Sequence, residues 1–153
     1  MPIVEKQNEK HLTTLDLNDA EIFNIEAILK YLRIHKSIKE VNFQNSNLDR
    51  QMIIKLVNAL VSREVQLSRL NLSKNEKIDD TICPILAHLF SQRSTIKHLF
   101  LDETKITEEG VGVIVESITE NLKVQTLSFR KCKVYITDPI ASPQWNLIKN
   151  VLK

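Results

Sequence analysis

The sequence has little glycine, proline, cysteine or aromatic content: its 153 residues include two Gly, four Pro and two Cys, and Phe, Trp and Tyr make up 5%. So few glycines and prolines exclude a long flexible linker. Cys83 and Cys132 stand alone, without CxxC or Cys/His spacing, so they predict neither a zinc site nor a disulfide framework. We therefore expect one domain held by an apolar core, with no cofactor.

Two further absences concern location and partners. No stretch approaches the roughly 18 apolar residues needed to cross a bilayer, and the first residues, MPIVEKQNEKHL, lack the apolar core of a secretory signal. The formal charge of +2 is too small to predict nucleic-acid binding, which needs a clustered basic face. These features predict a cytoplasmic, reduced protein that binds neither a membrane nor nucleic acid.

One pattern, apolar-x-x-apolar-x-apolar, occurs five times along the chain. The copies begin at Leu12, Ile38, Leu67, Ile96 and Val124, so their starts are 26, 29, 29 and 28 residues apart. A regular period of roughly 20–29 residues with this pattern is the signature of leucine-rich repeats. Each copy predicts a short strand whose apolar side chains face the core.

A small or polar residue lies three places after the last apolar position of each copy: Ala20, Ser46, Asn75, Thr104 and Cys132. Ser, Asn, Thr and Cys can donate hydrogen bonds to backbone carbonyls where the chain leaves the strand, Cys only weakly, whereas Ala20 cannot. We therefore interpret Cys132 as a member of this ladder rather than as a redox or catalytic residue. Cys83 is interpreted as a small packed residue of the third helix.

A helical period follows each of the first four copies. Apolar residues recur at helical spacing within residues 25–32, 52–60, 82–90 and 111–118. Asp49, Asp79 and Thr107 are suitable N-caps. The predicted fold is α/β: a right-handed β-α solenoid with a parallel sheet on its concave side and helices on its convex side.

A full helix in each unit and a period near 28–29 residues resemble the ribonuclease-inhibitor type of leucine-rich repeat. We predict one domain, with an N-terminal cap over 1–11, five repeats over about 12–134 and a C-terminal capping segment and helix over about 135–153. In that last segment, Ser142 and Pro143 would start the helix and Trp145 would seal the last repeat. The subfamily includes inhibitors, innate-immune sensors, actin-capping proteins, GTPase activators and secreted bacterial effectors, so the resemblance implies a macromolecular partner rather than one activity.

Catalytic motifs are missing from the sequence. Its four histidines are scattered, and it contains no HExxH, GxSxG or P-loop. Gly110-Val-Gly112 is a lone GxG that no downstream glycine completes into a dinucleotide fingerprint. The acidic pair Asp79-Asp80 lies at a predicted helix N-terminus, where carboxylates suit the helix dipole. We therefore expect no enzymatic activity.

The residues between the apolar strand positions should project into solvent on the concave face. Phe100 is the only aromatic residue at such a position, and an exposed aromatic among polar groups is typical of an interface anchor. A single exposed apolar residue also needs no functional explanation. We predict that another protein binds this face, through a set of seven residues: Phe100, His98, Asp102, Arg130, Arg69, Asn71 and Glu40.

Two pairs of opposite charge, Asp102 with Arg130 and Glu103 with Lys131, fall on neighbouring strands of this face. They either satisfy each other or are presented to the partner. Five strands about 4.8 Å apart give a concave strip on the order of 400 Å², about half of one partner's share of a standard interface. High-affinity binding would therefore have to recruit loops or a capping end, or the protein self-associates or belongs to a larger assembly. Weak or transient binding is the other alternative.

Three other functions fit the same repeats. A bacterial effector delivered into a host cell would suit the Ile-, Lys- and Asn-rich, Gly-poor composition, which is typical of an AT-rich genome. Actin capping is suggested because tropomodulin-type proteins look similar in having five such repeats and a terminal helix. GTPase activation would need an exposed arginine near the nucleotide, such as Arg130 or Arg69.

Overall fold

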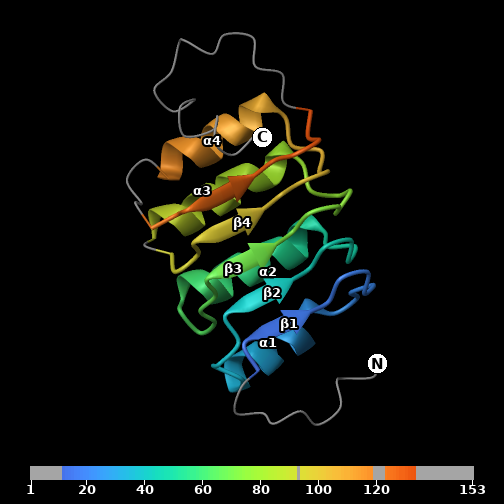
Figure 1. Cartoon of the computed structure of the whole chain (residues 1–153), viewed down its shortest axis with the longest axis vertical. Helices are drawn as coiled ribbons and strands as arrows, with labels where there is room; N and C mark the ends of the chain where they lie inside the picture. The colour runs from blue at the N-terminus through green and yellow to red at the C-terminus, as the bar shows by residue number, and fades with distance from the viewer. Residues whose placement is uncertain (1–11, 93, 119–122, 134–153) are drawn as a thin grey trace.

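A computed structural model describes residues 12–92, 94–118 and 123–133 (Figure 1). The predicted N-terminal cap over 1–11 lies outside these residues, as does the predicted C-terminal segment with Ser142, Pro143 and Trp145.

Short strands and helices alternate along the described chain and form two layers (Figure 1). The strands form one parallel sheet in chain order: β1 (Thr14–Asp16), β2 (Glu40–Asn42), β3 (Arg69–Asn71), β4 (His98–Phe100) and β5 (Thr126–Ser128). The helices lie behind this sheet: α1 (Ile25–Ile34), α2 (Arg50–Val61), α3 (Cys83–Ser91), which follows the 3-10 turn η2 (Asp80–Ile82), and α4 (Glu108–Ile118). This is the predicted α/β leucine-rich-repeat-like solenoid.

The strand register matches the sequence repeat. In the sheet, Arg69 of β3 lies opposite Glu40 of β2 and His98 of β4. Thr14 of β1 and Thr126 of β5 continue the same row. Equivalent positions of all five copies therefore form straight columns across the sheet, as the repeat predicts.

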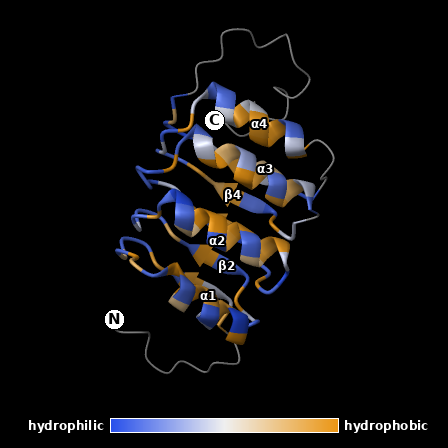
Figure 2. Ribbon diagram, turned by 180° about the vertical axis from the view of Figure 1, so that it is seen from behind, coloured by the Kyte–Doolittle hydropathy of each residue, from blue (hydrophilic) through white to orange (hydrophobic). Residues whose placement is uncertain are grey.

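The core lies between the sheet and the helices. Leu70 and Leu99, in the middle of β3 and β4, are fully buried, and so are Leu86 and Ile114 of the helices that cover them. Apolar and polar residues alternate along the helices (Figure 2), and the residues that each helix buries are almost all apolar. The predicted apolar faces are confirmed, because an amphipathic helix gains stability mainly by burying its apolar stripe.

The polar ladder after the strands is confirmed for the four residues whose side chains can donate a hydrogen bond. The Asn75 amide donates to the carbonyls of Leu72 and Phe43, at 2.9 Å each. Thr104 Oγ1 donates to Leu101 O at 2.8 Å, and Cys132 Sγ lies 3.1 Å from the same carbonyl. Ser46 Oγ donates to Phe43 O. Cys132 thus has the structural contact that its place in the repeat predicts.

Three side chains begin helical segments as N-caps. Asp49 Oδ1 accepts from Met52 N at 2.9 Å, as predicted, and Asp79 Oδ1 accepts from Thr81 N at 3.0 Å. Asn24, which the repeat pattern did not indicate, caps α1 by accepting from Glu26 N at 3.1 Å.

Thr107 directly precedes α4, at the predicted N-cap position, and its backbone carbonyl accepts from Val111 N at 3.1 Å. Its hydroxyl donates to Asp80 Oδ2 at 2.5 Å, while its backbone N–H donates to Asp80 Oδ1 at 2.7 Å. The Asp80 carboxylate of the preceding repeat accepts both hydrogen bonds from Thr107. Its charge makes these bonds stronger than bonds to a neutral acceptor. This bridge links the start of α4 to η2, which leads into α3.

Candidate functional site

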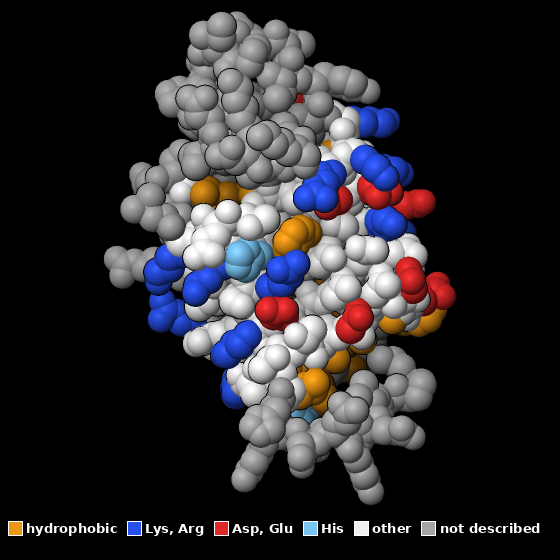
Figure 3. All heavy atoms as spheres, in the orientation of Figure 1, with side chains coloured by type: hydrophobic (Ala, Val, Ile, Leu, Met, Phe, Trp, Pro, Cys, Tyr) orange, Lys and Arg blue, Asp and Glu red, His pale blue; other side chains and the backbone are white. Residues whose placement is uncertain are grey.

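The candidate site is the sheet face, which consists of the two columns Thr14–Glu40–Arg69–His98–Thr126 and Asp16–Asn42–Asn71–Phe100–Ser128. These positions were expected to project into solvent, but Ser128 is buried. Figure 3 views the molecule from this side. Most of these side chains are polar, and Phe100 is the one large apolar member of the two columns. Parallel pairing in register places the members of each column side by side on adjacent strands.

Phe100 and Arg69 form the centre of the sheet face. The guanidinium carbon of Arg69 lies 4.5 Å from the centroid of the Phe100 ring, which is a cation–π contact. Arg69 itself is exposed, while Phe100 is only partly exposed. The sequence predicted a solvent-facing phenylalanine; the structure shows one whose ring is partly covered by an arginine.

In each of the first three repeats, the residue equivalent to Phe100 has a structural function. There an Asp or Asn ends the strand, and its side chain accepts a hydrogen bond from the backbone N–H two residues later. Asp16 accepts from Asn18 N, Asn42 from Gln44 N and Asn71 from Ser73 N, each at 3.0 Å. This is the local turn bond that Asx residues provide.

Phe100 cannot form that turn bond, and the neighbouring repeat supplies a substitute. The N–H of Asp102, two residues after Phe100, donates to Ser73 Oγ at 3.0 Å. An aromatic residue is therefore present where β1, β2 and β3 end in Asx, and the hydroxyl of Ser73, just after β3, compensates for the lost bond. The fifth repeat also lacks Asx, since Ser128 ends β5 and the N–H of Arg130 donates to Asp102 of the preceding repeat.

Asp102 is bound by the fold rather than presented to solvent. Its Oδ1 accepts from Ser128 Oγ at 2.5 Å and from the backbone N–H of Arg130 at 2.7 Å. No salt bridge joins the side chains of Asp102 and Arg130 within the part of the chain that the structure describes. The predicted contact between these residues exists, but it runs through the backbone of Arg130.

The other predicted site residues differ in how freely they are presented. His98 Nδ1 lies 3.0 Å from Thr126 Oγ1, which orients the imidazole along the sheet face. The Arg130 side chain is exposed, and Glu40 is half-buried beside Arg69. The pair Glu103 and Lys131 forms an exposed ion pair with 3.5 Å between Oε1 and Nζ.

Among the residues that the structure describes, two large apolar side chains are exposed that the sequence pattern did not indicate. Phe23 is 78% exposed and Ile34 is 67% exposed, and they lie at the two ends of α1. Phe23 precedes the Asn24 cap, the position at which an apolar residue often packs back onto the first helical turn. Its exposure could not be inferred from that pattern, because the pattern predicts a packed residue.

Neither a metal-binding cluster nor a reactive form of Cys83 occurs among the described residues. No group of three or more His, Cys, Asp or Glu residues suited to a metal ion occurs within residues 12–92, 94–118 and 123–133. Burial raises the pKa of the Cys83 thiol to about 12, with smaller contributions from Asp80 and Asp79. Of the helices that the structure describes, none is long and apolar enough to span a membrane.

No protein-family model matches the sequence, and no curated protein is significantly similar to it. Among solved structures, the tropomodulin C-terminal domain of Caenorhabditis elegans is similar, with a TM-score of 0.61 and 17% sequence identity. The match covers 81% of this chain and 72% of that one. The likeness establishes the fold as a leucine-rich-repeat-like solenoid, and it does not single out the ribonuclease-inhibitor type.

Proposed function

We propose that this chain is a non-catalytic interaction module that binds another protein through the sheet face, with Phe100 and Arg69 at the centre of the contact. The observation that carries this proposal is the replacement of the turn-forming Asx residue by Phe100. Stability alone does not favour a partly exposed aromatic there, since an Asn would supply its own turn bond.

The chemistry of the pair supports the same role. Aromatic residues and arginine dominate the binding energy of protein interfaces, particularly near the centre of the contact. A guanidinium already stacked on the ring loses little conformational freedom when a partner covers it. The small area of the sheet face makes such a concentrated centre necessary for appreciable affinity.

The decisive variant is Phe100→Asn, because it removes the aromatic ring and restores the turn bond that β1, β2 and β3 possess. We expect it to remain folded and to bind its partner at least about fivefold more weakly, which corresponds to ~1 kcal/mol. Proteins captured from lysate by the wild type are identified by mass spectrometry, and the affinity of a purified partner is then measured by calorimetry.

Phe23→Asn is the matched control, because it makes the same chemical change at an exposed phenylalanine outside the sheet. Unchanged affinity in Phe100→Asn, or an equal loss in both variants, would contradict the proposal.

Actin capping is a second candidate, supported by the likeness in fold to the tropomodulin domain and by the resemblance of the repeats to tropomodulin-type proteins. Elongation of pyrene-labelled actin filaments tests it directly. Slower elongation that Phe100→Asn relieves would support capping through the sheet face, and unchanged elongation at saturating protein would reject it.

A further inference from the structure

A second surface lies at the edge of the sheet where the strands begin. A depression of about 180 Å³ opens there between the α1–β2 connection and the α2–β3 connection. Its floor consists of Leu32, Ile38 and Val65, which are 3%, 2% and 3% exposed. The cationic side chains of Lys36, Lys39 and Arg63, all three exposed, surround this apolar floor.

The three cations have no carboxylate partner among the described residues. Lys36 Nζ donates to the backbone carbonyl of Glu64, and neither Lys39 nor Arg63 forms a salt bridge there. The carboxylate of Glu64 is already bound by Arg33, with 2.7 Å between Oε2 and Nε. Positive charge therefore accumulates around the depression without internal neutralisation.

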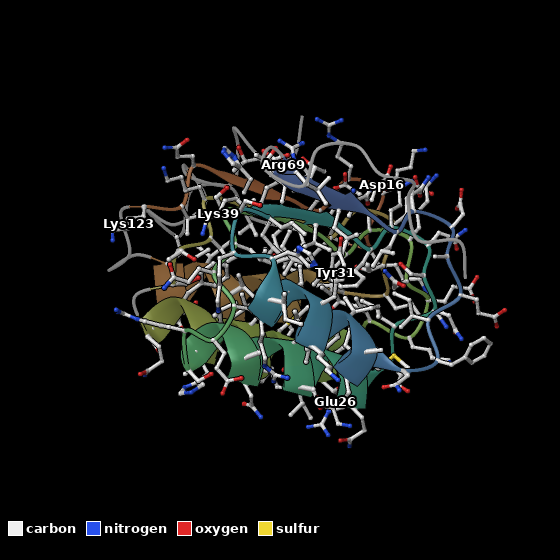
Figure 4. The ribbon with its side chains drawn as sticks, turned by 90° about the horizontal axis from the view of Figure 1, so that it is seen from below. Asp16, Glu26, Tyr31, Lys39, Arg69 and Lys123 are labelled. Carbon is white, nitrogen blue, oxygen red and sulfur yellow. The ribbon has the colours of Figure 1, made fainter. Side chains whose placement is uncertain are left out.

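The positive charge continues along the whole strand-start edge, defined here as residues 35–40, 62–69, 94–98 and 123–126. This edge carries six Lys or Arg residues, Lys36, Lys39, Arg63, Arg69, Lys97 and Lys123, against two acids, Glu40 and Glu64. Lys39 and Lys123 lie toward this edge in Figure 4, while Asp16 lies toward the opposite one. Figure 3 shows Lys and Arg side chains along the left flank, whereas the right flank carries acidic and basic side chains together.

Helix dipoles account for only part of this pattern. Lys36 and Arg63 follow the C-terminal ends of α1 and α2, where cations are favoured. Lys39 and Lys97 instead directly precede β2 and β4, where no helix end requires a positive charge.

We infer that the depression binds an acidic polypeptide segment, with one aliphatic side chain on the apolar floor and carboxylates paired with Lys36, Lys39 and Arg63. The inference builds on the proposed protein-binding role but uses the depression, none of whose lining residues belongs to the sheet face. Nucleic acid is a poorer match, because Glu40 and Glu64 interrupt the cationic edge and the whole chain has a formal charge of only +2.

The direct probe is a fluorescein-labelled heptapeptide in which a central leucine is flanked by three glutamates on each side. Fluorescence anisotropy should show binding that weakens when the salt concentration rises from about 50 to about 200 mM, since exposed ion pairs are screened. Replacing the leucine with serine should also weaken binding, because the apolar floor then loses its ligand.

The test variant is Lys39→Ser/Arg63→Gly, which removes two of the three cations. Arg63 has a φ of 61°, so glycine relieves backbone strain at this position, and the variant should fold normally. We expect its affinity for the heptapeptide to fall about tenfold. The control Lys74→Asn/Lys77→Ser removes the same charge from the opposite edge and should leave binding unchanged.

Three results would overturn the inference: no binding of the heptapeptide, equal weakening in the control, or tighter binding of an oligothymidylate of equal charge. Phe100→Asn should leave heptapeptide binding intact. If Phe100→Asn loses the protein partner while the heptapeptide fails to bind, the proposed function stands and only this inference falls. If the heptapeptide binds while Phe100→Asn retains the protein partner, this inference stands and the proposed function of the sheet face falls.

Discussion

The side-chain amide of Asn75 donates a hydrogen bond to the backbone carbonyl of Phe43, in the preceding repeat, at 2.9 Å. Its carbonyl oxygen accepts from the N–H groups of Ser46 and Leu48 in that same repeat, at 3.1 and 3.0 Å. One buried side chain therefore satisfies three backbone groups where the chain turns off β2. Because Asn75 is only 1% exposed, water cannot replace these contacts.

Asn75→Ala should consequently lower the free energy of unfolding by about 3 kcal/mol, since it leaves several buried backbone groups without partners. Urea unfolding followed by circular dichroism measures this change. Asn58→Ala is the control: Asn58 is exposed in the middle of α2, and alanine there should be neutral or slightly stabilising. Equal losses in the two variants would show that the ladder does not stabilise the repeats.

The ladder, the register and the helix faces could all be predicted from the sequence, because each depends on a local period. Alternation along a strand fixes which residues face the core, and a 28–29-residue repeat fixes which positions become neighbours. The partners of Asn75 follow from that register alone.

The details of the candidate site could not be predicted in the same way. The stacking of Arg69 on Phe100 and the bonding of Asp102 to the Arg130 backbone depend on side-chain rotamers, which a repeat pattern does not specify. The depression ringed by Lys36, Lys39 and Arg63 depends on the path of two connections that vary between repeats. Phe23 is exposed because its side chain does not pack onto the first turn of α1, where an apolar residue before an N-cap often packs.

The two glycines of α4 should respond in opposite ways to alanine. A Cβ added at Gly110 would lie 2.2 Å from Asp80 Oδ1 and 2.7 Å from Cys83 Sγ, and Asp80 is held in place by Thr107. A Cβ at Gly112 would meet nothing within 4 Å. We expect Gly110→Ala to destabilise by about 2 kcal/mol through overpacking, and Gly112→Ala to stabilise by about 1 kcal/mol through helix propensity. The midpoint temperature of thermal unfolding measures both changes in stability. A shift of the same sign in both variants would contradict the close packing at Gly110.

The two thiols should differ sharply in reactivity. Burial raises the pKa of Cys83 to about 12, so its thiolate is nearly absent at neutral pH, whereas Cys132 is partly exposed. Ellman's reagent should therefore label one thiol per native molecule, and Cys132→Ser should abolish the reaction. Labelling of Cys132→Ser at the rate seen in urea would show that Cys83 is accessible.

The same pKa shift predicts how stability depends on pH. The pKa of Cys83 is raised from 9.0, its ordinary value, to about 12 in the folded chain. Folding therefore favours the neutral thiol, and this contribution is complete below pH 9.0 and is lost as the pH rises toward about 12. Cys83→Ala should flatten the decline in unfolding free energy over that range. An unchanged decline in this variant would assign it to other groups.

The contact between Asp102 and Arg130 should contribute to stability without being an ion pair. Asp102 Oδ1 accepts from the backbone N–H of Arg130 and from Ser128 Oγ, so Asp102→Ala removes both bonds and should cost about 1–2 kcal/mol. Arg130→Ala retains the backbone donor and should change stability by less than about 0.5 kcal/mol. The double variant should then equal the sum of the two, because the cycle removes no side-chain interaction between them. Urea unfolding at low and high salt measures this coupling. A coupling energy above about 0.5 kcal/mol that disappears at high salt would mean that the charges do pair in solution, and that Arg130 is then less available to a partner than its exposed side chain suggests.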